Sequence, residues 1–345
     1  MLFPVFSSPH LPAQNNVSRV MGEVLLALLP GILCATWFFG WGVLVNIVIA
    51  ATTCVAAEAA VLALRGRAVR ATLADRSALL TGVLLALCLP PLAPWWIPVI
   101  GSLFAIVIAK QLYGGLGYNP FNPAMIGYVV LLISYPRELT LWIPPTGIEA
   151  QHLNLNLSQT LALIFTNSLP AETTIDALTM PTPLDATKTA FGLGQTLHEI
   201  KASPLFGHFG GVGWEWINLS FLIGGLYLLA RRVISWHIPA GLLGGLFLIA
   251  LVFYGSDTDA FPSPLFHLFS GAAMLGAFFI ATDPVSAATT PRGRLLFGAG
   301  IGVIAYVIRT WGGYPDGIAF GVLLMNMAAP TIDYYTKPRV FGQSK

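Results

Sequence analysis

The amino-acid sequence predicts an all-α polytopic membrane protein with about ten transmembrane helices. Its 345 residues are 56% hydrophobic and only 9% charged, whereas a soluble domain carries about 25% charged residues. A chain this long with so few charges cannot cover a water-facing surface, so lipid is the expected solvent. The net charge of +2 is too small and too scattered to indicate a nucleic-acid partner.

Ten apolar runs match or approach the roughly 17–25 residues that a helix needs to cross a bilayer. Two are short, since one ends at Pro90-Pro91 and the other follows a stretch rich in Gly, Asn and Pro. Irregular backbone at membrane depth is tolerated only where protein encloses it, so we expect cofactor or ion sites near these two runs. In chain order the expected spans are Met21–Phe39, Gly42–Leu64, Ser77–Leu89, Trp95–Leu112, Asn122–Tyr135, Trp214–Ala230, Ile238–Tyr254, Pro264–Ala281, Leu295–Arg309 and Gly317–Tyr335.

The runs form two membrane halves of five helices each, residues 1–135 and 214–345, on either side of the long polar segment 136–213. Because five spans precede that segment, the second half enters the membrane inverted, and we expect a 5+5 inverted repeat. The breaks at Pro90-Pro91 and Asp283-Pro284 would then be equivalent and face opposite sides of the membrane.

The basic residues predict the orientation, because cytoplasmic loops carry an excess of Lys and Arg. One set of loops holds thirteen of the 17 and the opposite set holds four. We therefore expect both termini in the cytoplasm and residues 136–213 on the outside, as a large periplasmic loop if the host is Gram-negative. The thirteen are Arg19, Arg65, Arg67, Arg70, Arg76, Lys110, Arg231, Arg232, Arg292, Arg294, Lys337, Arg339 and Lys345.

The cysteines and histidines do not indicate a metal site. Cys34, Cys54 and Cys88 lie in apolar runs without a CxxC spacing, so neither a disulfide framework nor a zinc or iron–sulfur site follows from them. The six histidines are scattered and have no metal-ligand spacing.

The middle of the polar segment carries the most informative motif. Taken alone, residues 176–185 are a Thr-, Pro- and Asp-rich cluster typical of a turn. They also resemble the flavinylation motif of the Rnf D-type subunits and of the homologous B-type subunit of the sodium-pumping NADH:quinone reductase. That motif begins with Asp, has Ser or Thr three residues later, and ends in a small residue followed by the acceptor Thr. Here it matches Asp176, Thr179 and Thr182.

The resemblance implies that Thr182 carries a covalent FMN through a phosphoester, which a periplasmic, magnesium-dependent flavin transferase attaches. Pro181 stands where the family usually has Ala. Because Pro fixes φ and lacks an N–H donor, the transferase must accept a stiffer segment. An acceptor hydroxyl must also be accessible, and a loop meets that requirement.

A second block, residues 110–124, contains three glycines and two Asn-Pro pairs. Each Asn-Pro pair can cap a helix with Pro at its first position. The block is therefore either a re-entrant turn with two helix starts or a polar ligand site inside the membrane. It resembles a characteristic block of the Rnf D-type family, and the matching region of the related B-type subunit is associated with a non-covalent riboflavin. The resemblance thus implies Asn119 and Asn122 as contacts of a second flavin.

Four acidic residues are further candidates, one of them Glu23 near the start of the first span, because a carboxylate in or near the membrane is costly unless it has a partner or a function. Asp283, close in sequence to Arg292 and Arg294, indicates either a helix cap with a basic anchor or, by resemblance, a contact of a flavin or a partner protein. Asp316, in residues 309–317, indicates either a tight turn or an ion exit path. Glu58 lies inside the second span, close enough to Arg65 to pair with it.

The family resemblance extends from Ser8 to Arg339. It implies a membrane subunit of a complex that couples electron flow between ferredoxin and NAD+ to movement of Na+ or H+. The expected partners are the A, B, C, E and G components of the Rnf complex, the flavin transferase and membrane lipid. The chain has neither a GxGxxG dinucleotide motif nor a cysteine cluster, so we expect no catalysis by this chain alone.

Two other classes of function fit the same spans. A secondary transporter or channel would share the inverted repeat, the broken helices and the buried acids, but it would not need Thr182. A purely structural membrane anchor would tolerate the loss of both Thr182 and Asn119.

Overall fold

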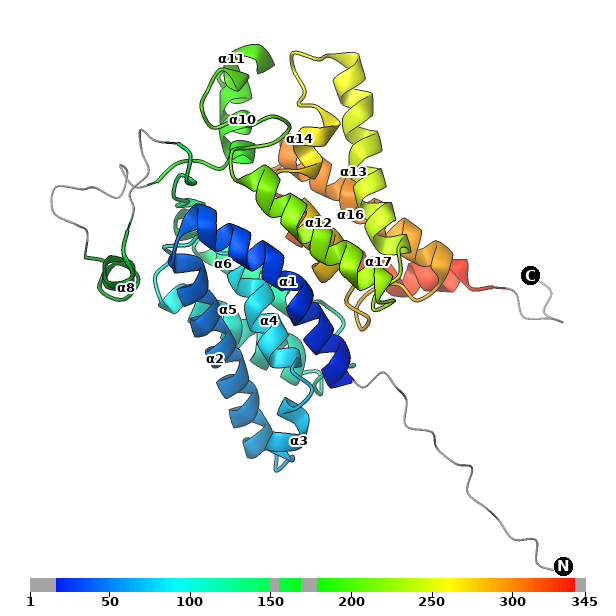
Figure 1. Ribbon diagram of the computed structural model, residues 1–345. Helices are drawn as coiled ribbons and strands as arrows, with labels where there is room; N and C mark the ends of the chain where they lie inside the picture. Colours follow the sequence, from blue (N-terminus) through cyan, green and yellow to red (C-terminus); the bar gives the residue numbers. More distant parts are fainter. Residues whose placement is uncertain (1–16, 149–154, 169–178, 339–345) are drawn as a thin grey trace, which may run out of the picture.

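Figure 1 shows the computed structural model, which describes residues 17–148, 155–168 and 179–338. Among these residues, helices make up the regular structure apart from two isolated bridges. One group of helices contains α1 (Val17–Phe39), α2 (Gly42–Leu64), α3 (Val69–Leu73), α4 (Ser77–Ala86), α5 (Trp96–Leu103), the π-helix η1 (Phe104–Gln111) and α6 (Pro123–Ser134). A second group contains α12 (Trp214–Ala230), α13 (His237–Ser256), α14 (Pro264–Leu268), α15 (Ala273–Leu275), the π-helix η2 (Gly276–Ile280), α16 (Pro291–Trp311) and α17 (Ile318–Thr336).

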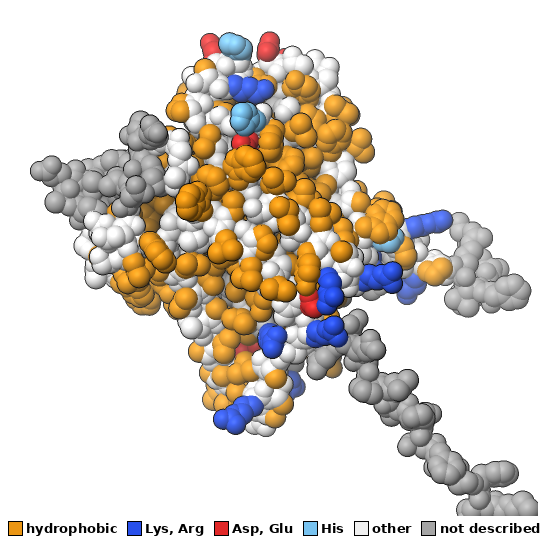
Figure 2. All heavy atoms as spheres, in the orientation of Figure 1, with side chains coloured by type: hydrophobic (Ala, Val, Ile, Leu, Met, Phe, Trp, Pro, Cys, Tyr) orange, Lys and Arg blue, Asp and Glu red, His pale blue; other side chains and the backbone are white. Residues whose placement is uncertain are grey.

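The length and composition of the helices agree with a polytopic membrane protein. Helices α1, α2, α13 and α16 are long and apolar enough to cross a membrane, whereas α4, α5 with η1, α6 and α12 are shorter apolar helices. On the face drawn in Figure 2, hydrophobic side chains cover the middle of the molecule and charged side chains gather toward its ends. The number of ten spans stays a prediction.

The helix of the third apolar run is short, as the sequence predicted. Helix α4 stops at Ala86 and the chain is irregular around Pro90-Pro91. The fully buried Asn46 of α2 donates its side-chain amide to the carbonyls of Pro90 (2.8 Å) and Pro91 (3.3 Å). Backbone carbonyls that are no longer hydrogen-bonded within the helix therefore have a donor inside the protein. Lipid could not supply such a donor.

The eighth expected span, Pro264–Ala281, is not one continuous helix. The segment is split into α14, α15 and η2, with Gly271 between them at φ +60°. The buried Asn218 of α12 donates to the carbonyls of Phe269 (3.3 Å) and Gly271 (3.0 Å) and accepts from the N–H of Met274 (3.2 Å). One amide side chain thus replaces the helical hydrogen bonds that the break removes.

The two groups of helices meet through helices at corresponding positions in each group. Helix α1 packs along α12, and α6 packs against α17. A Cβ atom on Gly31 of α1 would lie 2.1 Å from the ring of Phe221, and one on Gly224 of α12 would lie 2.0 Å from the carbonyl of Ala27. Small residues here let the two backbones approach closely.

The polar segment contains short helices that periodicity did not indicate. In the described part these are α7 (Pro136–Thr140), α8 (Leu157–Thr166), α10 (Pro183–Gly192) and α11 (Leu197–Lys201). Each has ten residues or fewer, which is too short for a repeating apolar face to stand out. Capping boxes at Asn156 and Thr196 begin α8 and α11.

Close packing of α13 on α16 yields a matched test. A Cβ atom on Gly245 would lie 2.7 Å from the carbonyl of Ala299, whereas one on Gly244 would meet nothing within 4 Å. We expect Gly245→Ala to lower the free energy of unfolding by about 1–3 kcal/mol through overpacking. Gly244→Ala should leave stability unchanged or raise it, because Ala favours a helix.

Apparent Tm values in detergent, followed with a thiol-reactive dye at the buried Cys54, measure this difference. Equal Tm values for the two alanine variants would contradict the packing described for α13 and α16.

Candidate functional site

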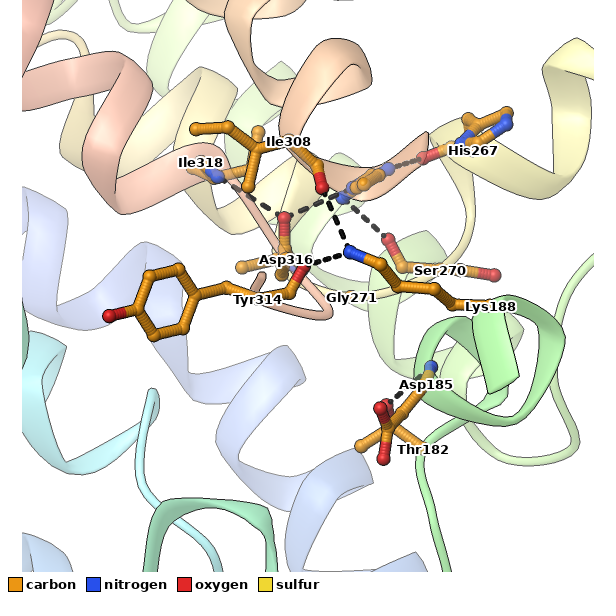
Figure 3. Close-up of polar contacts among 12 residues, drawn as sticks. Thr182, Asp185, Lys188, His267, Ser270, Gly271, Ile308, Tyr314, Asp316 and Ile318 are labelled. Atoms are coloured by element: carbon orange, nitrogen blue, oxygen red, sulfur yellow. Dashed lines mark hydrogen bonds and ion pairs between the residues drawn. The ribbon is translucent and has the colours of Figure 1, made fainter. Parts of the chain in front are cut away.

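Thr182 begins helix α10. Its side-chain oxygen accepts the N–H of Asp185 at 3.3 Å, and Pro183 takes the first helical position. Thr-Pro-x-Asp is a helix-start signal, so residues 182–185 are the first turn of a helix rather than an isolated turn. Figure 3 shows Thr182 and Asp185 at this end of α10. The half-buried hydroxyl therefore lies where the helix dipole is positive.

The residue two positions before Thr182 is held against the loop that follows α7. The N–H of Met180 donates to the carbonyl of Trp142 at 2.8 Å, in an antiparallel bridge. Thr179 is half-buried, and Asp176 lies outside the described residues. The bridge places Thr182 at a defined position next to the loop that follows α7.

Lys188 attaches α10 to the end of α16. Its ammonium group donates to the carbonyls of Ile308 (3.2 Å) and Tyr314 (3.0 Å), as Figure 3 shows, and also to the carbonyl of Gly312. Burial lowers the pKa of Lys188, and the nearby carboxylate of Asp185 opposes that shift. Burial likewise raises the pKa of Asp185, against the attraction of Lys188. Cations at a helix C-terminus also interact favourably with its dipole.

A buried ion pair lies behind Lys188. The guanidinium of Arg309 donates to Asp316 at 3.0 Å and to the carbonyls of His267 (2.5 Å) and Ser270 (3.2 Å). Asp316 also accepts the N–H of Ala272 at 2.8 Å. The pair therefore joins the α16–α17 turn to the break in the eighth apolar segment. Asp316 is a turn residue, as its sequence context predicted, and also the partner of a buried cation.

Thr182 and Asp316 line a common cavity of about 100 Å³, which we call the Thr182 cavity. Aromatic side chains from three parts of the chain form much of its wall, namely Tyr128, Trp142 and Trp214. Trp142 and Trp214 pack on each other with ring centroids 4.9 Å apart. Thr182 thus lies beside an apolar, aromatic cavity.

The three other sequence-predicted site residues come together elsewhere. Asn119, Asn122 and Asp283 line a cavity of about 110 Å³, which Lys110 and Phe279 also line. We call it the Asn122 cavity. It is enclosed by the beginnings of α1 and α6 and the end of η2, so it lies apart from Thr182. Residues more than 150 positions apart in the chain therefore contribute to one site.

Asn122 caps α6 as predicted, and it also crosses to the second group of helices. Its side-chain oxygen accepts from Met125 (3.2 Å), and its amide donates to the carbonyl of Ile280 (3.1 Å) at the end of η2. Its own N–H donates to Asn326 of α17 at 3.1 Å. No helix begins at Pro120, so the prediction of a cap by Asn119 was wrong. Asn119 instead donates to the carbonyl of Phe121 at 3.0 Å.

Asp283 has local partners rather than a basic one in the described part of the chain. Its carboxylate accepts from the hydroxyl of Ser286 (2.8 Å) and the N–H of Val285 (3.3 Å). Burial raises its pKa, and these hydrogen bonds oppose the shift. Arg294 donates to Ser235 instead, and Thr290 rather than Asp283 caps α16. Proximity in sequence to basic residues did not produce an ion pair.

The chain matches known proteins over almost its whole length. The model of the NQR2, RnfD and RnfE family matches residues 4–342. The chain belongs to this family. It is 52% identical to the D-type subunit of the ion-translocating oxidoreductase complex of Aliivibrio salmonicida over 353 residues, covering 100% of both chains. The same D-type proteins of Ectopseudomonas mendocina and Pectobacterium atrosepticum are 55% and 53% identical, over 97% and 100% of their lengths and 100% of this chain.

One ion pair in this member of the NQR2, RnfD and RnfE family differs from the sequence prediction. Glu58 does not pair with Arg65 but with Lys110 of η1, at 2.7 Å and with both side chains almost fully buried. Lys110 also donates to Ser77 (2.6 Å), and Gln111 donates to Glu58 (2.6 Å). Arg65 donates to the carbonyl of Gln111. The sequence feature that could have predicted this pair was the presence of one acidic and one basic residue inside apolar runs of the same membrane half.

Removing one partner of this pair tests how strongly it is coupled. We expect Lys110→Met to lower the free energy of unfolding by about 3–5 kcal/mol, because it leaves a buried carboxylate uncompensated. The double variant Glu58→Gln with Lys110→Met should recover most of the loss. Thermal unfolding in detergent measures both.

The exposed pair Glu23–Arg231 provides the control, since a surface ion pair contributes little. Glu23→Gln should leave the apparent Tm almost unchanged. If Lys110→Met had as small an effect as Glu23→Gln, the buried pair would not stabilise the fold in the way described.

Proposed function

We propose that this chain is the D-type membrane subunit of an ion-translocating oxidoreductase complex of the Rnf kind, and that it carries a covalent FMN on Thr182. The position of Thr182, at the start of α10 and within an acceptor-like motif, is the observation that carries the proposal. The relatives named as the D-type component of such a complex cover essentially the whole chain. The complex would move Na+ or H+, and NADH oxidation and ferredoxin binding would belong to other subunits.

The local geometry suits a phosphoester. A phosphate on Thr182 would lie at the N-terminus of a ten-residue helix, where free N–H groups and the helix dipole favour negative charge. In the described part of the chain, the hydroxyl oxygen takes part in a single hydrogen bond, the long one from Asp185. Pro181 beside it is exposed. The hydroxyl is thus available for modification without loss of a tight contact.

The flavin ring itself does not fit beside its attachment point in this conformation. The Thr182 cavity holds about 100 Å³, below the roughly 300–1,000 Å³ of typical ligand pockets. Bound FMN would supply the electron-relay chemistry, while the chain determines where the relay lies. Thr182 holds the phosphate, and the Met180–Trp142 bridge and Lys188 fix α10 against the membrane helices.

We extend the proposal to a second, non-covalent flavin, such as riboflavin, at Asn119, Asn122 and Asp283. The side-chain oxygen of Asn119 is buried and has no hydrogen-bond partner in the described residues, which favours a polar ligand. The cavity there holds about 110 Å³, however, so a flavin ring does not fit it as it stands. We therefore assign no step of electron transfer to it.

The charge distribution supports the proposed orientation. In Figure 2, Lys and Arg side chains gather toward one end of the molecule, and acidic and His side chains mark the end that carries α11. We place the basic end and both termini in the cytoplasm and Thr182 in the periplasm of an inner-membrane protein. This places Thr182 within reach of a periplasmic flavin transferase. The A, B, C, E and G components of the complex would be the other partners.

In-gel flavin fluorescence after denaturation tests the attachment. The protein would be co-expressed with a flavin transferase, and we expect a fluorescent band for the native sequence and none for Thr182→Ala. Thr189→Ala, which alters an exposed Thr of the same helix, should fluoresce at the native level. A dark native band, with a control substrate labelled by the same transferase, would contradict the proposal.

A secondary transporter without a redox role is the second candidate. The broken helices and the buried Glu58–Lys110 pair favour it, since intramembrane charges often mark ion pathways. A transporter would not require flavin, so a dark native band would favour this function.

A further inference from the structure

The largest of the described cavities lies along α10, on the side of the molecule that carries Thr182. It holds about 480 Å³, within the roughly 300–1,000 Å³ typical of ligand pockets. We call it the α10 cavity. Leu184, Lys188 and Phe191 of α10 contribute to its wall, and their spacing places them on one face of the helix. The 257–262 loop and the end of α16 form the opposite side.

The cavity contains a buried imidazole without a partner. His267 is only 3% exposed and lines the cavity, and neither of its ring nitrogens has a hydrogen-bond partner in the described part of the chain. Its carbonyl accepts from Arg309, whereas its ring points away from Asp316 in Figure 3. A buried polar group without a partner is destabilising. His267 therefore indicates a ligand with a hydrogen-bonding edge.

Aromatic side chains line the same space. Phe191, Phe261, Phe266 and Trp311 surround it from α10, the 257–262 loop, α14 and α16. The ring centroids of Phe261 and Trp311 are 6.5 Å apart. Aromatic walls of this kind favour a planar aromatic ligand, through offset-stacked or edge-to-face contacts.

The charges around the cavity disfavour a free anion. Asp257 and Asp259 line it from an exposed loop and would repel one. Lys188 and Arg309 also line it, but their donors already bind backbone carbonyls and Asp316. The lining is therefore complementary to an uncharged planar ring whose edge meets His267.

The cavity lies close to the proposed attachment point. Leu184, two residues after Thr182, lines both the Thr182 cavity and the α10 cavity. Thr187 also lines the α10 cavity, and a helix rises about 1.5 Å per residue, so it lies about 7.5 Å along the axis from Thr182. A ring on a flexible ribityl phosphate arm at Thr182 can span that distance, while its phosphate stays away from Asp257 and Asp259.

From these observations we infer that the α10 cavity receives the isoalloxazine ring of the FMN on Thr182, with His267 binding the polar edge of the ring. The inference rests on the proposed flavinylation and adds the place of the ring. Docking there removes the ring from water and holds it against the ends of α14 and α16.

Acrylamide quenching of flavin fluorescence in the native, flavinylated protein tests the docking. Ala260 lies on the exposed loop and lines the cavity, so Ala260→Trp should fill it and expel the ring. We expect acrylamide to quench the native protein weakly and Ala260→Trp nearly as strongly as denatured protein. Ala202→Trp, at an exposed position after α11 outside the cavity, should behave like the native protein.

His267→Leu gives a second readout that does not depend on filling the cavity. Loss of the imidazole should shift the flavin absorption spectrum and increase acrylamide quenching, with the covalent in-gel signal retained. Bright gel bands with equally strong quenching in all variants, the native sequence included, would overturn the docking site while leaving Thr182 as the acceptor. A dark native band would instead remove the flavinylation on which the inference depends.

Discussion

Backbone carbonyls inside a membrane need hydrogen-bond partners that lipid cannot supply, and this need shapes the fold. Each interrupted apolar segment leaves such groups behind. Asn46 satisfies those at Pro90-Pro91, and Asn218 and Arg309 satisfy those between α14 and α15. Asn122 does the same at the end of η2. Because each donor comes from a different helix, these bonds also determine which helices pack together.

The Arg309–Asp316 pair connects this internal framework to the candidate flavin site. Asp316 lines the Thr182 cavity, Arg309 lines the α10 cavity, and Lys188 binds the carbonyls of the same α16–α17 turn. Lys188 thus holds α10 at the α16–α17 turn, and the Arg309–Asp316 pair joins that turn to the break in the eighth apolar segment. A flavin attached at the start of α10 would have a defined position relative to the membrane helices, as electron transfer between fixed sites requires.

The two candidate flavin regions share a short element, η2, in their walls. Phe278 and Phe279 of η2 line the Asn122 cavity, and Ile280 lines the Thr182 cavity. The hydrogen bond from the Asn122 amide to the carbonyl of Ile280 closes this wall. π-helical turns often occur at functional sites, and here one separates the two cavities. The same geometry suits a redox protein and a transporter, so flavin attachment decides between them.

Local sequence determined the membrane class, most helix positions and the cap at Asn122, because hydropathy and capping depend on residues adjacent in the chain. It also carried the helix-start signal at Thr182. Only the tertiary structure decided that Glu58 pairs with Lys110 rather than Arg65, that Gly271 interrupts the eighth span, and that Asp283 shares a cavity with Asn119 and Asn122. These contacts depend on how helices distant in sequence pack around buried polar groups, which the spacing of residues along the chain does not specify.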